Sequence, residues 1–93
     1  SGSQEDHVSM GWGAGRKLLQ VLDNTSRVLA IELMCAAQGI EYRRPQLAAP
    51  RSRRICEVVR ASVPSLAHDR PVGEDIDRLA LAIERGDIDL ALA

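Results

Sequence analysis

The chain has 93 residues, of which 45% are hydrophobic and 27% charged, and its formal net charge is −1. This length allows at most one domain, and the balanced charge excludes a general electrostatic drive towards nucleic acid or an anionic membrane. There is one Trp, one Tyr and no Phe, so we expect an aliphatic core built largely from residues that favour helices.

Residues 1–15 begin with a polar cluster. Four consecutive positions carry an amide, two carboxylates and an imidazole, from Gln4, Glu5, Asp6 and His7 respectively. On spacing alone, a carboxylate here could simply cap a helix and suit its positive end. The density of different polar groups suits a reaction site better, so we interpret residues 1–15 as the edge of an active site that leads into a helix.

A long helix is predicted over residues 16–42. Glycines at positions 11, 13 and 15 precede it, and each disfavours a helix by about 1 kcal/mol relative to alanine, so we expect an irregular start before Arg16. Gly39 and Pro45 are the candidate stop signals. Apolar or small side chains recur in steps of three and four, at Leu18, Leu22, Thr25, Leu29, Leu33, Ala36 and Ile40.

This helix is too long and too apolar for a small chain. Between Val28 and Ala37 only Glu32 is polar, so this part must be covered on all sides. About 26 helical residues span roughly 40 Å, whereas a compact chain of this length has a radius of gyration of about 12 Å. We therefore expect the helix to protrude and to belong to a multi-subunit helical bundle.

Residues 43–93 are predicted to form a C-terminal helical subdomain. It opens with a linker over 43–50, and Pro50 can start a helix over 51–62 that Pro64 ends. One face of this helix carries Ile55, Val58, Val59 and either Ser62 or Val63.

A third helix is predicted over residues 73–85, with Gly86 as its stop signal. Asp87 is expected to cap a last short turn. The fold class is therefore all-α: one long helix, two shorter helices and a short C-terminal turn. The apolar stripe of the third helix comprises Ile76, Leu79, Ala80 and Ile83.

Basic residues gather around the linker. With only Tyr42 available for stacking, we interpret them as a solvated loop rather than a nucleic-acid patch. His68 and Asp69 are likewise interpreted as loop residues, because no nucleophile motif accompanies them. The basic residues are Arg43, Arg44, Arg51, Arg53 and Arg54.

The two cysteines predict a reducing, cytoplasmic setting and no metal site. Cys35 and Cys56 lie in apolar helical contexts, and Cys35 is expected to be a small core residue. Neither a CxxC motif nor Cys/His metal spacing occurs. No signal peptide is visible, and no apolar run reaches the roughly 20 residues that span a bilayer.

The segment Gln4–Gly11 (Gln-Glu-Asp-His-Val-Ser-Met-Gly), followed by Ala14–Leu18, resembles the C-terminal part of histidine ammonia-lyase, in the aromatic amino acid lyase family. Lyases of this family that act on phenylalanine or tyrosine usually show a Gln-Asp-Val type sequence here, so Glu5 and His7 favour the histidine branch. The resemblance continues at Asp23-Asn24, Arg27–Glu32, Asp69-Arg70 and Asp75-Ile76.

The resemblance implies a parent enzyme that eliminates ammonia from histidine to give urocanate. The electrophile of this family is a methylidene-imidazolone (MIO) made from an internal Ala-Ser-Gly, which these residues do not contain. The resemblance also implies a homotetramer, in which each active site draws residues from three subunits. The partners would then be the remainder of the lyase and its other subunits, and the chain alone should be inactive.

By the same resemblance, Glu5 and Gln4 are the catalytic candidates. Glu5 aligns with a glutamate thought either to bind the substrate imidazole or to help remove the β-proton; among apolar helices, desolvation would raise its basicity. Gln4 aligns with an amide near the MIO group, where it can donate to a developing oxyanion. Asp6 and His7 would support these two residues.

Two other hypotheses remain open. A small, non-enzymatic helical oligomerisation module needs only the apolar stripe from Leu18 to Ile40. A segment of a tyrosine or phenylalanine ammonia-lyase, or of an aminomutase, would share the helices and differ in substrate.

Overall fold

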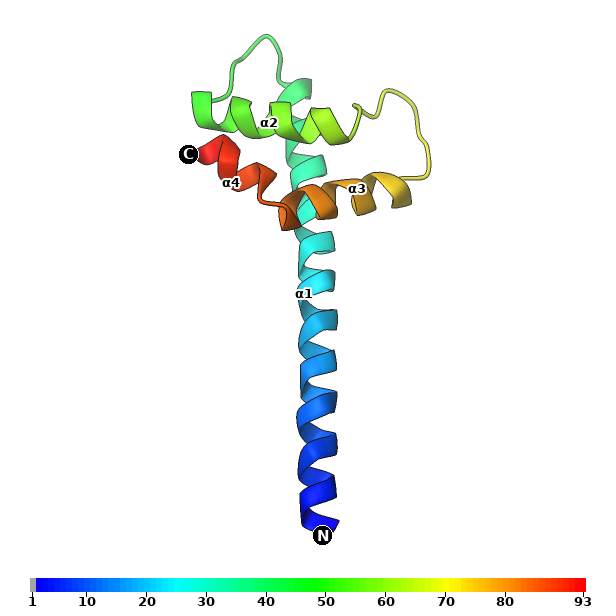
Figure 1. Ribbon diagram of the computed structural model, residues 1–93. Coiled ribbons are helices and arrows are strands. Elements are labelled where there is room, and N and C mark those ends of the chain that lie inside the picture. Colours follow the sequence, from blue (N-terminus) through cyan, green and yellow to red (C-terminus); the bar gives the residue numbers. More distant parts are fainter. Residues whose placement is uncertain (1) are drawn as a thin grey trace.

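One helix dominates the molecule. The computed structural model describes the backbone of residues 2–93 and the side chains of residues 11–93. Helix α1 spans Gly2–Tyr42, which corresponds to about 60 Å at 1.5 Å per residue. Figure 1 shows the other helices gathered around its C-terminal part, while its N-terminal part projects away from them. The predicted end of the helix near Tyr42 is confirmed.

The predicted start of this helix at Arg16, after an irregular segment, is wrong. The backbone is already helical at Gly2, and Gly11, Gly13 and Gly15 lie inside α1. A Cβ added at any of these three glycines would meet nothing within 4 Å, so no described neighbour requires them to be glycine. Glycine weakens a helix without breaking it, and a nucleated helix gains one hydrogen bond for each residue added.

Three shorter helices follow: α2 (Pro50–Ser62), α3 (Gly73–Glu84) and α4 (Asp87–Leu92). Residues 2–93 contain helices and no strand, which confirms the all-α class. Pro50 lies in the first turn of α2, as predicted, and Val63 beyond its end has extended backbone angles. Pro64 therefore follows a helix that has already ended, which suits its missing N–H group.

Gly86 separates α3 from α4. Its φ of +86° lies in the left-handed region, which glycine adopts without the steric cost that other residues incur. The predicted stop signal is therefore confirmed. The predicted capping role of Asp87 is wrong, because Gly86 occupies the N-cap position and no side chain caps α4.

Helices α2, α3 and α4 are the C-terminal helices. The core lies where α2 and α3 pack across α1, and α4 packs on α2 and α3 (Figure 1). The largest fully buried side chains of the core are Leu79, Val59 and Val63. Leu79 and Val59 lie on apolar faces as predicted, and of the two alternatives Ser62 and Val63 it is Val63 that is buried. Alanines on α1 and α3 keep the helices close, because small side chains allow backbones to approach. The buried apolar residues are Ala30, Ala37, Val59, Val63, Leu79, Ala80 and Ala82.

The C-terminal helices cover only part of the predicted stripe of α1: Leu33 packs against the core, while most of the stripe lies beside or beyond the covered face. Ala30 and Ala37 face the core, whereas Leu18, Leu22 and Leu29 are 58%, 55% and 43% exposed. Helix α1 thus has a covered apolar face and a second apolar face that no described residue covers. A helix with two apolar faces is suited to packing between other helices.

The overall dimensions agree with a protruding helix. The radius of gyration is 18.3 Å and the principal extents are 68 × 33 × 17 Å, compared with about 12 Å for the radius of gyration of a compact chain of this length.

Cys35 is exposed, so its predicted core position is wrong; it lies on α1 away from the buried alanines. Among the described residues, no helix has both the length and the hydropathy needed to cross a membrane.

Candidate functional site

The predicted site residues lie in the first two turns of α1. Gln4, Glu5, Asp6 and His7 belong to this helix, but their side chains lie outside the described part of the structure. Along the helix axis, Asp6 is about 45 Å from Ala37 in the core, at 1.5 Å per residue. The C-terminal helices pack at the opposite end of α1 (Figure 1), so they do not form a wall around these residues.

The following turns of α1 are exposed to solvent. Apart from Gly13, every residue from 11 to 25 is exposed, including the large apolar side chains of Trp12, Leu19 and Val21. Binding sites for small substrates are concave and enclose most of the ligand. A substrate pocket at this end of α1 therefore requires walls from polypeptide other than residues 11–93.

At the other end of α1, Glu41 is held by α2 and the loop that follows it. Arg60 donates a hydrogen bond to Glu41 Oε1, and the Ser65 hydroxyl donates to Oε2 at 2.7 Å. The hydrogen bond from Arg60 is the main cause that lowers the pKa of Glu41 from its ordinary value; burial opposes it, while Ser65 and the charge of Arg44 add to it. Glu41 is thus held as a carboxylate and is unsuited to act as a base.

Gln38 fixes the same loop from one turn earlier. Its Nε2 donates to the Leu66 carbonyl at 3.3 Å, and its Oε1 accepts from the Leu66 N–H at 3.1 Å. Both backbone groups of Leu66 are therefore paired with one side chain, which holds the loop against α1.

Asp75 is the buried charged residue of the C-terminal helices. It lies in the first turn of α3 with 4% of its surface exposed, and it accepts hydrogen bonds from Arg70 and Arg78. A buried carboxylate paired with two arginines is compensated. We assign it to stability, although Asp75 and Arg70 belong to the motifs that carry the family resemblance.

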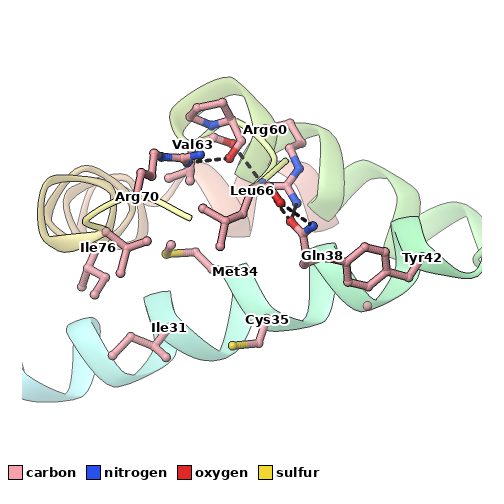
Figure 2. A pocket seen from close by; sticks show the side chains of 13 residues that line it. Ile31, Met34, Cys35, Gln38, Tyr42, Arg60, Val63, Leu66, Arg70 and Ile76 are labelled. Atoms are coloured by element: carbon pink, nitrogen blue, oxygen red, sulfur yellow. Dashed lines mark hydrogen bonds between the residues drawn. The ribbon is translucent and has the colours of Figure 1, made fainter. Parts of the chain in front are cut away.

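A groove of about 420 Å³ runs between α1, the loop after α2 and α3. In Figure 2 the side chain of Met34 lies between Leu66 and Ile76. Its polar lining residues Gln38, Arg60 and Arg70 already form the hydrogen bonds described above. The lining also includes the free thiol of Cys35 and the phenol of Tyr42, and the rest of the groove offers shape and apolar surface.

Two further predictions concern the described loops and metal sites. His68 and Asp69 are exposed residues of the loop before α3, as predicted. Among the side chains of residues 11–93, no group of three or more His, Cys, Asp or Glu residues is placed to hold a metal ion. Nothing local in the sequence indicates the roles of Glu41, Arg60 and Gln38, because their partners lie 19 to 28 positions away.

Comparison with known proteins gives one family. The model of the family "Aromatic amino acid lyase" matches residues 1–61. The chain is 48% identical over 86 residues to histidine ammonia-lyase of Natranaerobius thermophilus, covering 92% of this chain and 17% of that protein.

Other relatives agree. The histidine ammonia-lyase of a Geobacillus strain is 51% identical over 80 residues, covering 86% of this chain and 16% of that protein. The histidine ammonia-lyase of Bacillus subtilis is 48% identical over 79 residues, covering 85% of this chain and 16% of that protein. The chain spans about a sixth of the length of these curated relatives. No solved structure gives a significant match.

The matched region contains Gln4, Glu5, Asp6 and His7 together with all of α1 and most of α2. Since 61 of the 93 residues match the family model, the chain belongs to the aromatic amino acid lyase family.

Proposed function

We propose that this chain is the C-terminal portion of a histidine ammonia-lyase, which converts L-histidine to urocanate and ammonia in histidine catabolism. One observation carries the proposal: the segment with the resemblance, Gln4–His7, lies at the N-terminal end of α1, where residues 11–93 supply no pocket wall. The relatives described above, all named histidine ammonia-lyase, support histidine as the substrate.

The reaction needs a base and an electrophile. The base takes the β-proton of histidine, the Cα–N bond breaks, a Cα–Cβ double bond forms, and the amino group leaves as ammonia. A positioned carboxylate commonly contributes about 10²- to 10⁴-fold to such a proton transfer. In the proposal Glu5 either takes this proton or binds the substrate imidazole, while Asp6 and His7 support it.

The MIO cofactor would come from the rest of the parent enzyme. The 93 residues contain no Ala-Ser-Gly, so they do not fit as its source. In the complete enzyme this group supplies the electrophile. Gln4 is proposed to lie beside it as an uncharged amide donor, which can stabilise negative charge without adding a charge of its own.

The remainder of the lyase and the other subunits of a homotetramer are the proposed partners. The exposed apolar side chains of α1, among them Leu18, Leu22 and Leu29, support this assignment because they require cover. We place the parent enzyme in the cytoplasm, where thiols remain reduced; the two unpaired cysteines, one of them exposed, support this placement.

A reconstitution experiment tests the proposal. The chain alone, the remaining part of a histidine ammonia-lyase alone, and the two together are incubated with L-histidine, and urocanate is followed by its absorbance. We expect activity only when both parts are present. An oligomerisation module without enzymatic function would assemble and leave the mixture inactive. A lyase or aminomutase for tyrosine would react with tyrosine in place of histidine.

A further inference from the structure

Positive charge is concentrated in one short part of the chain. Residues 43–54 contain five arginines and no acidic residue, whereas the other 81 residues carry seven basic and thirteen acidic residues. All five are exposed, and none forms an ion pair with a described side chain. This arginine cluster comprises Arg43, Arg44, Arg51, Arg53 and Arg54.

Two arginines of the cluster lie at the N-terminus of α2, where positive charge destabilises a helix. Arg51 and Arg53 follow Pro50 at the N-terminus of this helix, where there is no acidic residue and no side-chain cap. The N-terminus carries the positive end of the helix dipole, so cations there are disfavoured by about 0.3–1 kcal/mol each. Within the described chain the charge of Arg44 favours the carboxylate of Glu41, but folding of α2 gives no reason for Arg51 and Arg53. An anion would be attracted by both the arginines and the helix end.

A hollow lies beside the cluster. It has a volume of about 360 Å³ and is formed by the C-terminal end of α1, the turn that follows it, and α2. This volume is at the lower end of the range for small-molecule sites, about 300–1,000 Å³. Its charged lining residues are Arg44, Arg53, Arg60, Glu41 and Glu57, and its less polar surface comes from Ile40, Leu47, Ala48 and Cys56.

The charges that line the hollow do not cancel. Arg60 and Glu41 form an ion pair with each other. Arg44 and Arg53 remain against the single carboxylate of Glu57, and no described ion pair uses any of these three residues. The hollow therefore keeps an excess positive charge, and the other arginines of the cluster increase the local positive potential.

We propose that this hollow binds a small organic polyanion, a phosphate ester or a polycarboxylate, through the guanidinium groups of Arg44 and Arg53. Guanidinium groups bind both kinds of oxyanion with paired hydrogen bonds. The less polar lining of the hollow, from Ile40, Leu47, Ala48 and Cys56, accepts the carbon skeleton of the ligand. The site lies at the opposite end of α1 from Gln4–His7 (Figure 1), so it does not depend on the proposed function.

Titration of the 93-residue chain at low salt tests the proposal, with pyrophosphate and citrate as separate probes and backbone amide shifts as the readout. We expect saturable shifts confined to residues 40–60 with at least one probe. A response to pyrophosphate alone assigns a phosphate ligand, and a response to citrate alone assigns a carboxylate ligand. Shifts that grow linearly with both probes, or spread over the whole chain, would overturn the proposal.

Variants separate a specific site from a general charge effect. Arg44→Gln and Arg53→Gln should each weaken binding by about 10- to 100-fold, as expected for lost hydrogen bonds to a charged group. Arg44→Lys keeps the charge and should recover only part of the affinity. Arg16→Gln, the same charge change at an exposed position on α1, is the control and should change affinity less than about twofold, since exposed charges beyond a Debye length are largely screened. Equal losses in Arg16→Gln and Arg44→Gln would contradict a defined site.

Discussion

Arg70 and Asp75 join the loop before α3 to the first turn of that helix. Nη2 and Nε of Arg70 lie 2.9 Å and 3.1 Å from the same oxygen, Oδ2 of Asp75. Arg70 also donates to the carbonyls of Pro64 and Ser65, and Arg78 donates to the other oxygen of Asp75. One buried carboxylate thus organises the loop between α2 and α3.

Asp75→Asn should lower the free energy of unfolding by about 2–3 kcal/mol. Removing one partner of a buried ion pair leaves the other uncompensated, and the loss stays below the full 3–5 kcal/mol because the arginines reach solvent. Urea unfolding followed by circular dichroism measures the change. The control is Asp77→Asn, which breaks the exposed pair with Arg27 and should cost less than about 1 kcal/mol. Similar losses in the two variants would show that Asp75 has no special role.

The stability of the fold should depend on the ionisation of Glu41. Its pKa in the folded state lies below the ordinary value of 4.5 because Arg60 hydrogen-bonds to the carboxylate. A carboxyl group with a lowered folded pKa stabilises the fold above its unfolded pKa, and the contribution is lost as pH falls through the folded pKa.

Glu41→Gln tests this pH dependence. We expect it to lower the free energy of unfolding by about 1.5–3 kcal/mol at neutral pH, as for a hydrogen bond to a charged group. The difference from the wild type should shrink as the pH falls below 4.5, the ordinary value. Glu84→Gln, which removes an exposed carboxylate from α3, should follow the wild-type curve. A difference that is constant across this pH range would rule out the ion pair as its source.

The small core should depend strongly on Leu79. Its side chain is fully buried, so Leu79→Ala should lower the free energy of unfolding by about 2–5 kcal/mol. Leu81 lies on the same helix and is exposed, which makes Leu81→Ala a matched control with a change of about 0.5 kcal/mol or less. Thermal or urea unfolding of the two variants measures both values. If the Leu79→Ala variant had the same free energy of unfolding as the wild type, the stability of the fold would not depend on the core around Leu79.

Local signals in the sequence predicted most of the helix boundaries. Pro50 and Gly86 have fixed backbone preferences, so their positions at a helix start and a helix stop do not depend on distant contacts. The start of α1 was missed because three glycines were given more weight than the long helix that follows them. Cys35 was misplaced because its apolar neighbours in the sequence do not reveal which face of α1 is covered.

The polar contacts of the C-terminal helices were not predictable from the sequence. Glu41 and Arg60 meet because α2 packs back across α1, and nothing local in either segment indicates that register. The candidate site has a different basis: Gln4 and Glu5 are proposed from the family resemblance alone. In that proposal other polypeptide completes the site, so neither the pattern nor the packing of residues 11–93 could predict it.

The uncovered face of α1 should cause the chain to associate. Leu18 and Leu22 are more than half exposed, and burying a leucine side chain contributes about 1.5–3 kcal/mol. The double variant Leu18→Gln/Leu22→Gln should therefore weaken self-association by about 100-fold or more. Sedimentation velocity over a concentration series measures this change.

The matched control for association is Leu81→Gln/Leu90→Gln, which changes two exposed leucines on the C-terminal helices. Its sedimentation profile should match that of the wild type. If the wild-type chain stays monomeric at all concentrations, its exposed apolar face on α1 does not bind a second copy, and the prediction of association is wrong.

In the proposed function Glu5, at the N-terminal end of α1, acts in an active site that other polypeptide completes. The most direct test of this claim compares urocanate formation by the reconstituted enzyme carrying Glu5→Gln with that of an enzyme carrying Glu84→Gln. We predict that Glu5→Gln lowers kcat/KM, while Glu84→Gln leaves kcat and KM unchanged. A loss in kcat of about 10²- to 10⁴-fold, the usual contribution of a positioned acid or base, assigns the proton transfer to Glu5, and a raised KM assigns it to binding of the imidazole. A Glu5→Gln enzyme with the wild-type kcat/KM would contradict the claim.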